Sequence, residues 1–181
     1  MAAEAPRPIP AGGPGSAAHA FDWASTPLGP MDGWPQPLKT AAHIALGSNI
    51  PMFVCWGRDL LVVHNDSYGE LLGDRRPALG RPIAEIWHDH WDVIEAYTQR
   101  VLAGETVYLE AVPRTLRRGG QEETAWLTAC YNPIYDETGR PAGIFGAITS
   151  VSEDERTQER LKESEERFRL IADSAPVLMW V

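Results

Sequence analysis

The sequence predicts an α+β domain built on an antiparallel sheet: a β-hairpin, then several helices, then a three-stranded meander. Apolar runs at Met52–Trp56 and Leu60–His64 flank the turn Gly57–Asp59 and predict the hairpin. Three further strands are predicted at Thr106–Val112, Glu123–Tyr135 and Pro141–Thr149, with glycine-containing turns at 117–120 and 136–140. An apolar stripe of helical period lies between the two groups of strands, and we expect it to cover the sheet.

The N-terminal region divides into two parts. Residues 1–20 are rich in Ala, Pro and Gly and lack periodicity, which predicts disorder. Residues 21–50 form an N-terminal extension in which Trp23 and Trp34 are expected to pin an extended, proline-rich segment onto the domain. A short helix is predicted over Leu38–Leu46, since Pro37 suits a first helical turn and Gly47 a helix end.

Two helices are predicted between the strands. The first, Ser67–Leu72, has Asn65 or Asp66 as its N-cap and ends at Gly73. Residues 75–85 contain two prolines and a glycine, so only short turns are expected there. The second helix, Ile86–Ala103, presents one stripe at alternating spacings of four and three residues, made of Trp87, Trp91, Ile94, Thr98, Val101 and Leu102.

The C-terminal region repeats part of the middle of the chain. Residues 171–180 resemble residues 46–56: each passes from a helix-like end through a proline, Pro176 or Pro51, into an apolar run with a tryptophan. The separation of the two prolines is typical of tandem domains and too long for a solenoid repeat. Residues 174–181 are therefore expected to be the truncated start of a second domain.

Residues 152–173 are strongly charged and predict a linker helix. Apolar or small residues recur on one narrow seam of that helix, at Leu161, Ser164, Phe168 and Ile171. Two interpretations stay open: a solvated connector, or a parallel coiled coil that forms a dimer. The tandem arrangement favours the coiled coil.

Composition excludes several classes of function. Hydrophobic residues make up 44% and charged residues 23%, as in ordinary globular domains. The net charge of −9 and the lack of a Lys/Arg cluster argue against nucleic-acid binding. No apolar run reaches the length of a membrane span, and the N-terminus lacks a signal-peptide pattern. We therefore expect a cytoplasmic location and no membrane contact by this segment.

A set of short motifs then points to one family. They are Trp23 with Thr26–Pro30 and Trp34-Pro35, Pro51–Gly57, His64–Tyr68, Leu79–Pro82, and Tyr131–Asp136 followed by Gly139. Each motif is weak alone, but their order and spacing together resemble a PAS domain of bacterial multi-domain sensors of the sensor histidine kinase type. Ser164–Arg169 before Ala175-Pro176 resembles the usual lead into a following PAS domain.

The resemblance implies a PAS domain over residues 51–151, with a five-stranded antiparallel sheet in the order 2-1-5-4-3 and helices on one face. It also implies signal relay through a homodimer to downstream PAS and kinase domains of a two-component system. In the family, an acidic-hydrophobic-Thr triplet at the end of the last strand couples the core to the exit helix. The matching residues here are Ser150, Val151 and Ser152, so that coupling lacks its usual charge.

The strand order also separates the two cysteines. Cys55 and Cys130 would lie two strands apart, at roughly 10 Å, which is too far for a disulfide. We expect both to be reduced, buried small hydrophobes. They form no pattern of metal-ligand spacing.

The fold would place a small-molecule cavity between the helices and the sheet. The residues predicted to line it are Tyr68, Trp87, His90, Trp91, Ile94, Trp126, Thr128, Cys130 and Asn132. Such pockets are mostly apolar with a few polar groups. A core filled by its own side chains, with no ligand, is the competing interpretation.

The histidines of the cluster His88–Trp91 are the candidates for binding a cofactor or metal. His90 lies near the apolar stripe and is the candidate axial ligand if the domain holds haem. A surface or packing histidine at a helix start is the favoured interpretation of His90, and His88 and His90 are wrongly spaced to share a zinc ion. A photochemical flavin would require a reactive cysteine on the helices, whereas both cysteines fall on strands. No cofactor is the favoured expectation, and this fragment is not expected to be an enzyme.

The sequence therefore predicts a sensory or relay PAS module that acts through dimerisation and a C-terminal signalling helix. A haem- or other cofactor-bearing redox or gas sensor is one alternative. A ligand-free domain for protein–protein interaction is another.

Overall fold

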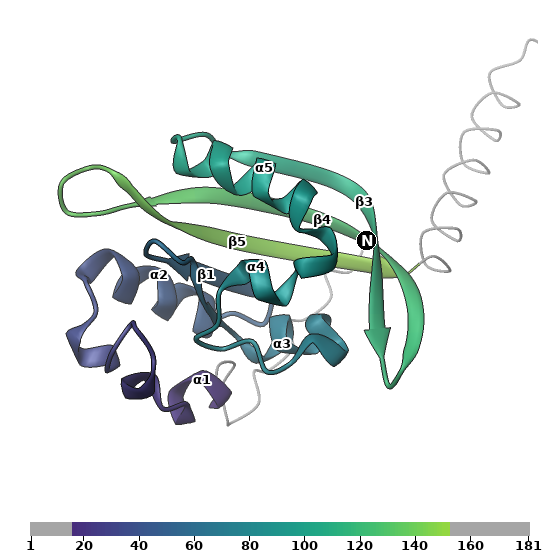
Figure 1. Cartoon of the computed structure of the whole chain (residues 1–181), viewed down its shortest axis with the longest axis horizontal. Helices are drawn as coiled ribbons and strands as arrows, with labels where there is room; N and C mark the ends of the chain where they lie inside the picture. Colours follow the sequence, from purple (N-terminus) through teal and green to yellow (C-terminus); the bar gives the residue numbers. More distant parts are fainter. Residues whose placement is uncertain (1–15, 153–181) are drawn as a thin grey trace, which may run out of the picture.

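The computed structural model describes residues 16–152 as one antiparallel sheet with helices against both of its faces (Figure 1). The strands are β1 (Met52–Trp56), β2 (Leu61–His64), β3 (Val107–Arg118), β4 (Gln121–Tyr135) and β5 (Pro141–Ser152). They pair in the order β2-β1-β5-β4-β3, and every pair is antiparallel. The predicted α+β class and strand order are confirmed.

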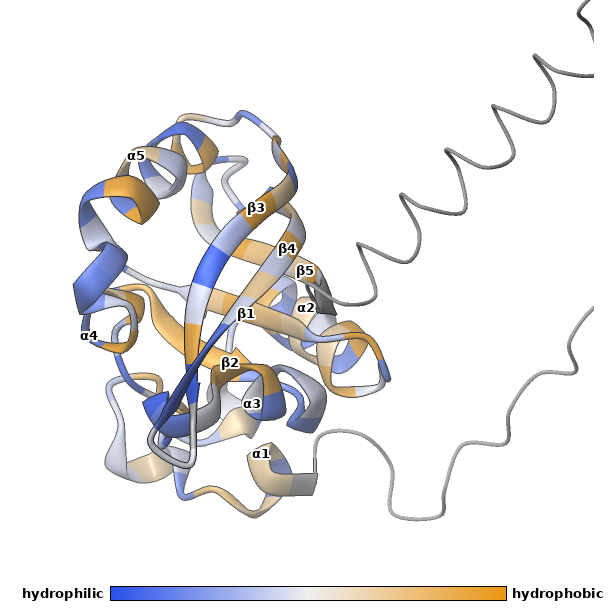
Figure 2. Cartoon of the chain, turned by 90° about the vertical axis from the view of Figure 1, so that its right-hand side faces the viewer, coloured by the Kyte–Doolittle hydropathy of each residue, from blue (hydrophilic) through white to orange (hydrophobic). Residues whose placement is uncertain are grey.

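The inner face of the sheet carries the main core. It is covered by α3 (Asp66–Leu72), α4 (Ile83–Ile86) and α5 (Trp91–Leu102), with short 3-10 turns η3 (Gly73–Arg75) and η4 (His88–His90) between them. Figure 2 shows α4 and α5 on one side of the sheet and α2 on the other. Alternate strand residues point inward, among them Phe53, Leu127 and Ile144.

The N-terminal extension builds a second core on the outer face of β1 and β2. It consists of α1 (Ser16–Ala20), the turns η1 (Trp23–Ser25) and η2 (Met31–Gly33), and α2 (Gln36–Leu46). Trp23 and Trp34 are both 3% exposed and meet edge to face at 5.0 Å. Each indole donates its N–H to a carbonyl, that of Ala18 or of Gly29, at 2.8 Å. The tryptophans therefore hold this segment in place as predicted.

The segment Ser16–Ala20 differs from the prediction. Disorder was expected over 1–20, but Ser16–Ala20 is helical and the side chain of Ala18 is fully buried. Its carbonyl accepts the Trp23 indole N–H, and the Ala17 amide lies 3.3 Å from the Asp66 carboxylate. These long-range contacts order a stretch that has no helical periodicity of its own.

The predicted helix Ile86–Ala103 is interrupted. Trp87 has φ −112° and ψ 33°, which ends α4, and α5 starts only at Trp91. The Trp87 ring turns toward the core, where its N–H donates to the Tyr68 hydroxyl at 3.2 Å. This contact with Tyr68 outweighs the apolar stripe of helical period, which runs through Trp87 without a break.

Three strands are longer than predicted. β3 was expected to end at Val112 but continues to Arg118, β4 starts at Gln121 rather than Glu123, and β5 continues from Thr149 to Ser152. β3 can include Pro113 because it is an edge strand, where a missing N–H costs little. The predicted linker helix after Ser152, the seam at Leu161, Ser164, Phe168 and Ile171, and residues 174–181 lie outside the described residues.

Candidate functional site

A partly open apolar cavity lies between the inner face of the sheet and α3–α5. It offers about 40 Å³ for the centres of water-sized molecules. Side chains from all three of these helical elements and from every strand except β2 line it: Phe53, Tyr68, Ile83, Trp87, Ile94, Tyr97, Thr98, Val101, Arg114, Leu127, Tyr131, Ile144 and Ile148. Most of this wall is apolar, and the polar groups are hydroxyls, the indole of Trp87 and one guanidinium, as in small-molecule sites.

Trp87 is held from two sides. Its indole N–H donates to the Tyr68 hydroxyl, and the Arg75 guanidinium lies over its ring at 4.5 Å from the centroid. Arg75 in turn makes two bonds to the Asp89 carboxylate, at 2.7 and 2.6 Å. The Arg75 hydrogen bonds lower the pKa of Asp89. This arrangement fixes the cavity wall that precedes α5.

Two tyrosine hydroxyls keep their protons at the cavity. Burial raises the pKa of Tyr131 to about 12, although the charge of Arg114 opposes that change. Burial also raises the pKa of Tyr68 above its ordinary value. Both phenols are therefore neutral near pH 7 and keep an O–H to donate. Phe53 separates them, with ring centroids 4.8 Å from Tyr68 and 5.9 Å from Tyr131.

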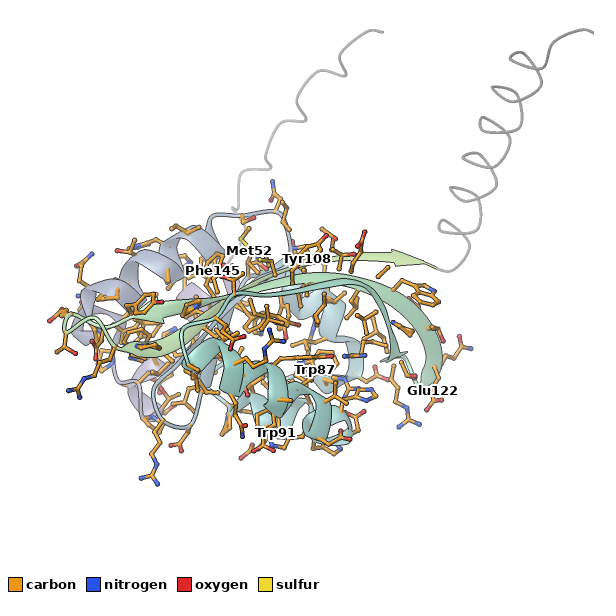
Figure 3. All side chains as sticks on the ribbon, turned by 90° about the horizontal axis from the view of Figure 1, so that it is seen from above. Met52, Trp87, Trp91, Tyr108, Glu122 and Phe145 are labelled. Atoms are coloured by element: carbon orange, nitrogen blue, oxygen red, sulfur yellow. The ribbon has the colours of Figure 1, made fainter. Side chains whose placement is uncertain are left out.

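The predicted lining residues of the helical region fall into two groups. Tyr68, Trp87 and Ile94 line the cavity. Trp91 packs against the same core but is not part of the lining (Figure 3 shows it with Trp87 on the side of the sheet that α5 covers). His90 is also outside the lining: its Nε2 atom lies 3.9 Å from the Asp89 carboxylate, on the side of Arg75.

The four residues predicted on β4 lie on the opposite face of the sheet. Trp126, Thr128, Cys130 and Asn132 alternate with Leu127, Ala129 and Tyr131, which point into the core. Thr128 accepts a hydrogen bond from the Ala111 amide at the β3 bulge, and Asn132 donates to the Cys130 sulfur. Both faces of β4 carry apolar residues, so the alternation alone does not tell which face is inward.

Several cavity residues were not predicted. Tyr97 lies beside the expected stripe on α5. Arg114 lies beyond the predicted end of its strand, and Tyr131 lies on the face of β4 that was not predicted to line the cavity. One signal for Arg114 exists in the sequence. Arg114 lies on the same face of β3 as Val112 and Leu116, so a charged residue occupies the apolar face of its strand. A charge at such a position marks a functional or strained site.

The cavity does not fit the larger cofactors considered from the sequence. A drug-sized ligand needs a pocket of roughly 300–1,000 Å³, whereas this cavity is about tenfold smaller. His90 does not face it, so the geometry does not support haem. Cys55 and Cys130 are free thiols on strands, and burial raises the pKa of Cys55, which makes it unreactive. Among residues 16–152, no cluster of three metal-ligating side chains occurs.

The predicted relay residues end the last strand. Ser150, Val151 and Ser152 pair with Leu127, Trp126 and Ala125 of β4. The same strand carries Ile144 and Ile148, which line the cavity. Within the described part of the chain, no helix is long and apolar enough to cross a membrane.

Solved structures with a similar arrangement include several sensor domains. The PAS domain of BvgS from Bordetella pertussis has a TM-score of 0.49 and 23% identity, over 72% of this chain and 97% of that one. A sensory box sensor histidine kinase from Vibrio cholerae has a TM-score of 0.43 and 17% identity, over 64% and 90%. An RNA-binding light-oxygen-voltage receptor has a TM-score of 0.47 and 17% identity, over 80% and 41%.

Sequence comparison identifies a relative and a family. The uncharacterized protein y4lL of Sinorhizobium fredii is 49% identical over 108 residues. The match spans 59% of this chain but only 13% of that protein. Residues 48–156, more than half of this chain, match the family described as the PAS fold. The chain therefore belongs to the PAS-fold family.

Proposed function

We propose that this chain is the sensory and signal-relay PAS module of a larger bacterial signal-transduction protein of the sensor histidine kinase type. The module acts as a homodimer and passes its signal to the segment that follows β5. Family membership supports the sensory role. A place in a larger protein is supported by the relative, since the matching region is only a small part of that chain. The cytoplasmic location stays a prediction from the sequence.

One observation carries the relay. β5 contacts the cavity through Ile144 and Ile148 and then runs directly into Ser150–Ser152, where the strand ends. Opposite it, α5 contributes Ile94, Tyr97 and Val101 to the same cavity. A change in the packing of α5 on the sheet therefore acts on β5 without an intermediate element, and β5 leads to the linker segment. This is a two-state packing shift of the kind that relays signals between domains.

Dimerisation is tested on the whole chain by analytical ultracentrifugation. We expect the wild type to be a dimer, because the seam residues predict a two-stranded coiled coil. Leu161→Glu and Phe168→Glu place charges in that seam and should give monomers. Glu166→Gln is the matched control, since Glu166 lies on the opposite side of the predicted helix. A monomeric wild type, or seam variants that remain dimers, would refute this mode of association.

The relay is tested by amide hydrogen exchange. Ile94→Ala enlarges the cavity on α5, at a position remote in sequence from the end of β5. We expect faster exchange at residues 149–152 and in the segment after them. Exchange in β2, which does not line the cavity, should change less. Equal changes throughout the domain would indicate general destabilisation and would contradict a directed relay.

A further inference from the structure

Arg114 is a cation on the inner face of the sheet. On β3 it is opposite Ala125, which is 2% exposed, and its own side chain is half-buried in the cavity wall. Its one assigned hydrogen bond is from Nη1 to the carbonyl of the preceding residue, Pro113, at 2.9 Å. In the described part of the chain, no carboxylate lies within ion-pair distance of Arg114.

Four other arginines of the domain are paired, and the described ones that have no carboxylate within ion-pair distance, Arg58, Arg76 and Arg140, are exposed rather than half-buried. Arg75, Arg81, Arg100 and Arg117 each lie 2.6–3.4 Å from a carboxylate oxygen. Acidic residues also exceed basic ones in this chain, 25 to 16, so partners are abundant. A half-buried charge is only partly hydrated, and a counter-charge beside it lowers that cost. An anion that enters the apolar cavity would supply the counter-charge that Arg114 lacks.

A neutral hydrogen-bond donor is available on the same wall. Tyr131 lines the same cavity as Arg114. Among residues 16–152, no acceptor is assigned to the Tyr131 hydroxyl. A guanidinium and a phenol O–H together match the two oxygens of a carboxylate, since both donate and neither needs to ionise.

Size and polarity limit the rest of the ligand. The cavity holds roughly three water-sized volumes, which suits a molecule of the size of acetate or propionate. Ile94, Ile144 and Ile148 supply apolar contacts suited to an alkyl tail. We infer that the cavity binds a short-chain monocarboxylate, with its carboxylate at Arg114 and Tyr131 and its alkyl group against these isoleucines. This rests on the proposed sensory function and names the class of its ligand.

The test is isothermal titration calorimetry on the whole chain, with propionate as the probe and propionamide as its uncharged analogue. Propionate should bind and should also change the fluorescence of Trp87, which shares the cavity. Propionamide should bind at least about tenfold more weakly, because it lacks the charge that Arg114 pairs with. Equal binding of the two compounds, or no binding of acetate, propionate or butyrate, would overturn the proposal. Equal affinity for nitrate would replace the carboxylate with a simple anion site and would also overturn it.

Variants separate the site from the rest of the strand. Arg114→Gln should lower propionate affinity at least about tenfold, and Arg114→Lys should retain part of it. Tyr131→Phe should weaken binding by a smaller factor. Arg117→Gln is the matched control: it lies on the same strand but on the other face, paired with Glu122 at 3.4 Å, and should leave binding unchanged. Unchanged affinity in Arg114→Gln would refute the assignment.

A second measurement guards against loss of folding. Without propionate, Arg114→Gln should melt at the same temperature as the wild type or higher, because it removes an unpaired charge. A lower melting temperature would show that Arg114 has a structural role and would count against the site. Dimerisation is a separate outcome. A dimer that ignores propionate refutes this inference alone, whereas a monomer that binds propionate refutes the proposed mode of relay alone.

Discussion

Asn65 joins four segments of the domain, and its replacement gives the most direct test of the structural reasoning. The side chain is fully buried and has five hydrogen-bond partners. Its Oδ1 atom accepts from the amides of Met52 at the start of β1 and Tyr68 in α3, at 3.1 and 2.9 Å. Its Nδ2 atom lies 2.7–3.1 Å from the carbonyls of Ala45, Ser48 and Ile50, which share its two hydrogens. It thus ties the end of α2 and the loop after it to β1 and α3.

The expected loss of stability follows from the groups that would lose their partner. In Asn65→Ala the amides of Met52 and Tyr68 lose their acceptor, and each unsatisfied buried group costs about 1–3 kcal/mol. The Tyr68 contact is also the N-cap of α3, whose loss costs about 1 kcal/mol by itself. We therefore expect Asn65→Ala to lower the free energy of unfolding by about 3 kcal/mol. For a chain of this size that corresponds to a melting temperature lower by roughly 10 °C.

Urea denaturation followed by circular dichroism measures this change. Asn65→Ser should recover about 1 kcal/mol, because a serine hydroxyl still caps α3 but cannot reach all three carbonyls. Asn132→Ala is the control, since this half-buried asparagine on the outer face bonds only side chains, and we expect a loss below about 1 kcal/mol. A loss of less than about 1 kcal/mol for Asn65→Ala, or no difference from the control, would refute the assigned role.

Two further predictions concern a buried histidine and a close backbone approach. Burial lowers the pKa of His64, which is 6% exposed. The unfolded chain therefore binds protons more readily than the folded one. Stability should fall as the pH drops below about 6.5 toward the lower folded pKa. His64→Gln should flatten this dependence in urea midpoints taken from pH 7.5 to 5.5, and an unchanged slope would exclude His64 as its cause. Gly143→Ala would place a Cβ atom 2.5 Å from the Cys55 carbonyl oxygen, where β5 meets β1. It should cost about 1–3 kcal/mol or more in thermal denaturation, whereas Gly33→Ala, which meets nothing within 4 Å, should be close to neutral.

The fold was largely predictable because its connections are local and carry strong turn residues. Gly57, Gly119, Gly120 and Gly139 all adopt positive φ at the ends of strands, and these turns separated the apolar runs correctly. Where the local pattern failed, the cause is a contact or an environment that the pattern does not encode. The Trp23 indole orders Ala18, the Tyr68 hydroxyl draws Trp87 out of a helix, and the edge position of β3 tolerates Pro113.

The candidate site was less predictable because its residues depend on which face of each strand is inward. A shift of one residue exchanges the two faces of a strand. On β4 both faces carry large apolar or aromatic residues, Trp126 on one and Tyr131 on the other. On β1 and β2 the N-terminal extension buries the outer face, so there too the contrast between a polar and an apolar face is missing. The prediction was more accurate on the helices, because the N-cap at Asn65 placed Tyr68 and the apolar stripe placed Ile94.

The two faces of the sheet divide the proposed roles between them. The inner face encloses the cavity, while on the outer face α2 covers β1 and leaves β3 open, where Tyr108 is 62% exposed (Figure 3 shows Tyr108 on the side away from Trp87). A ligand at Arg114 would contact β3, and one against Ile144 and Ile148 would contact β5. Since β4 pairs with both strands along most of its length, a shift at either would be shared across the meander. We therefore expect a bound anion to shift the meander more than β2, which does not line the cavity.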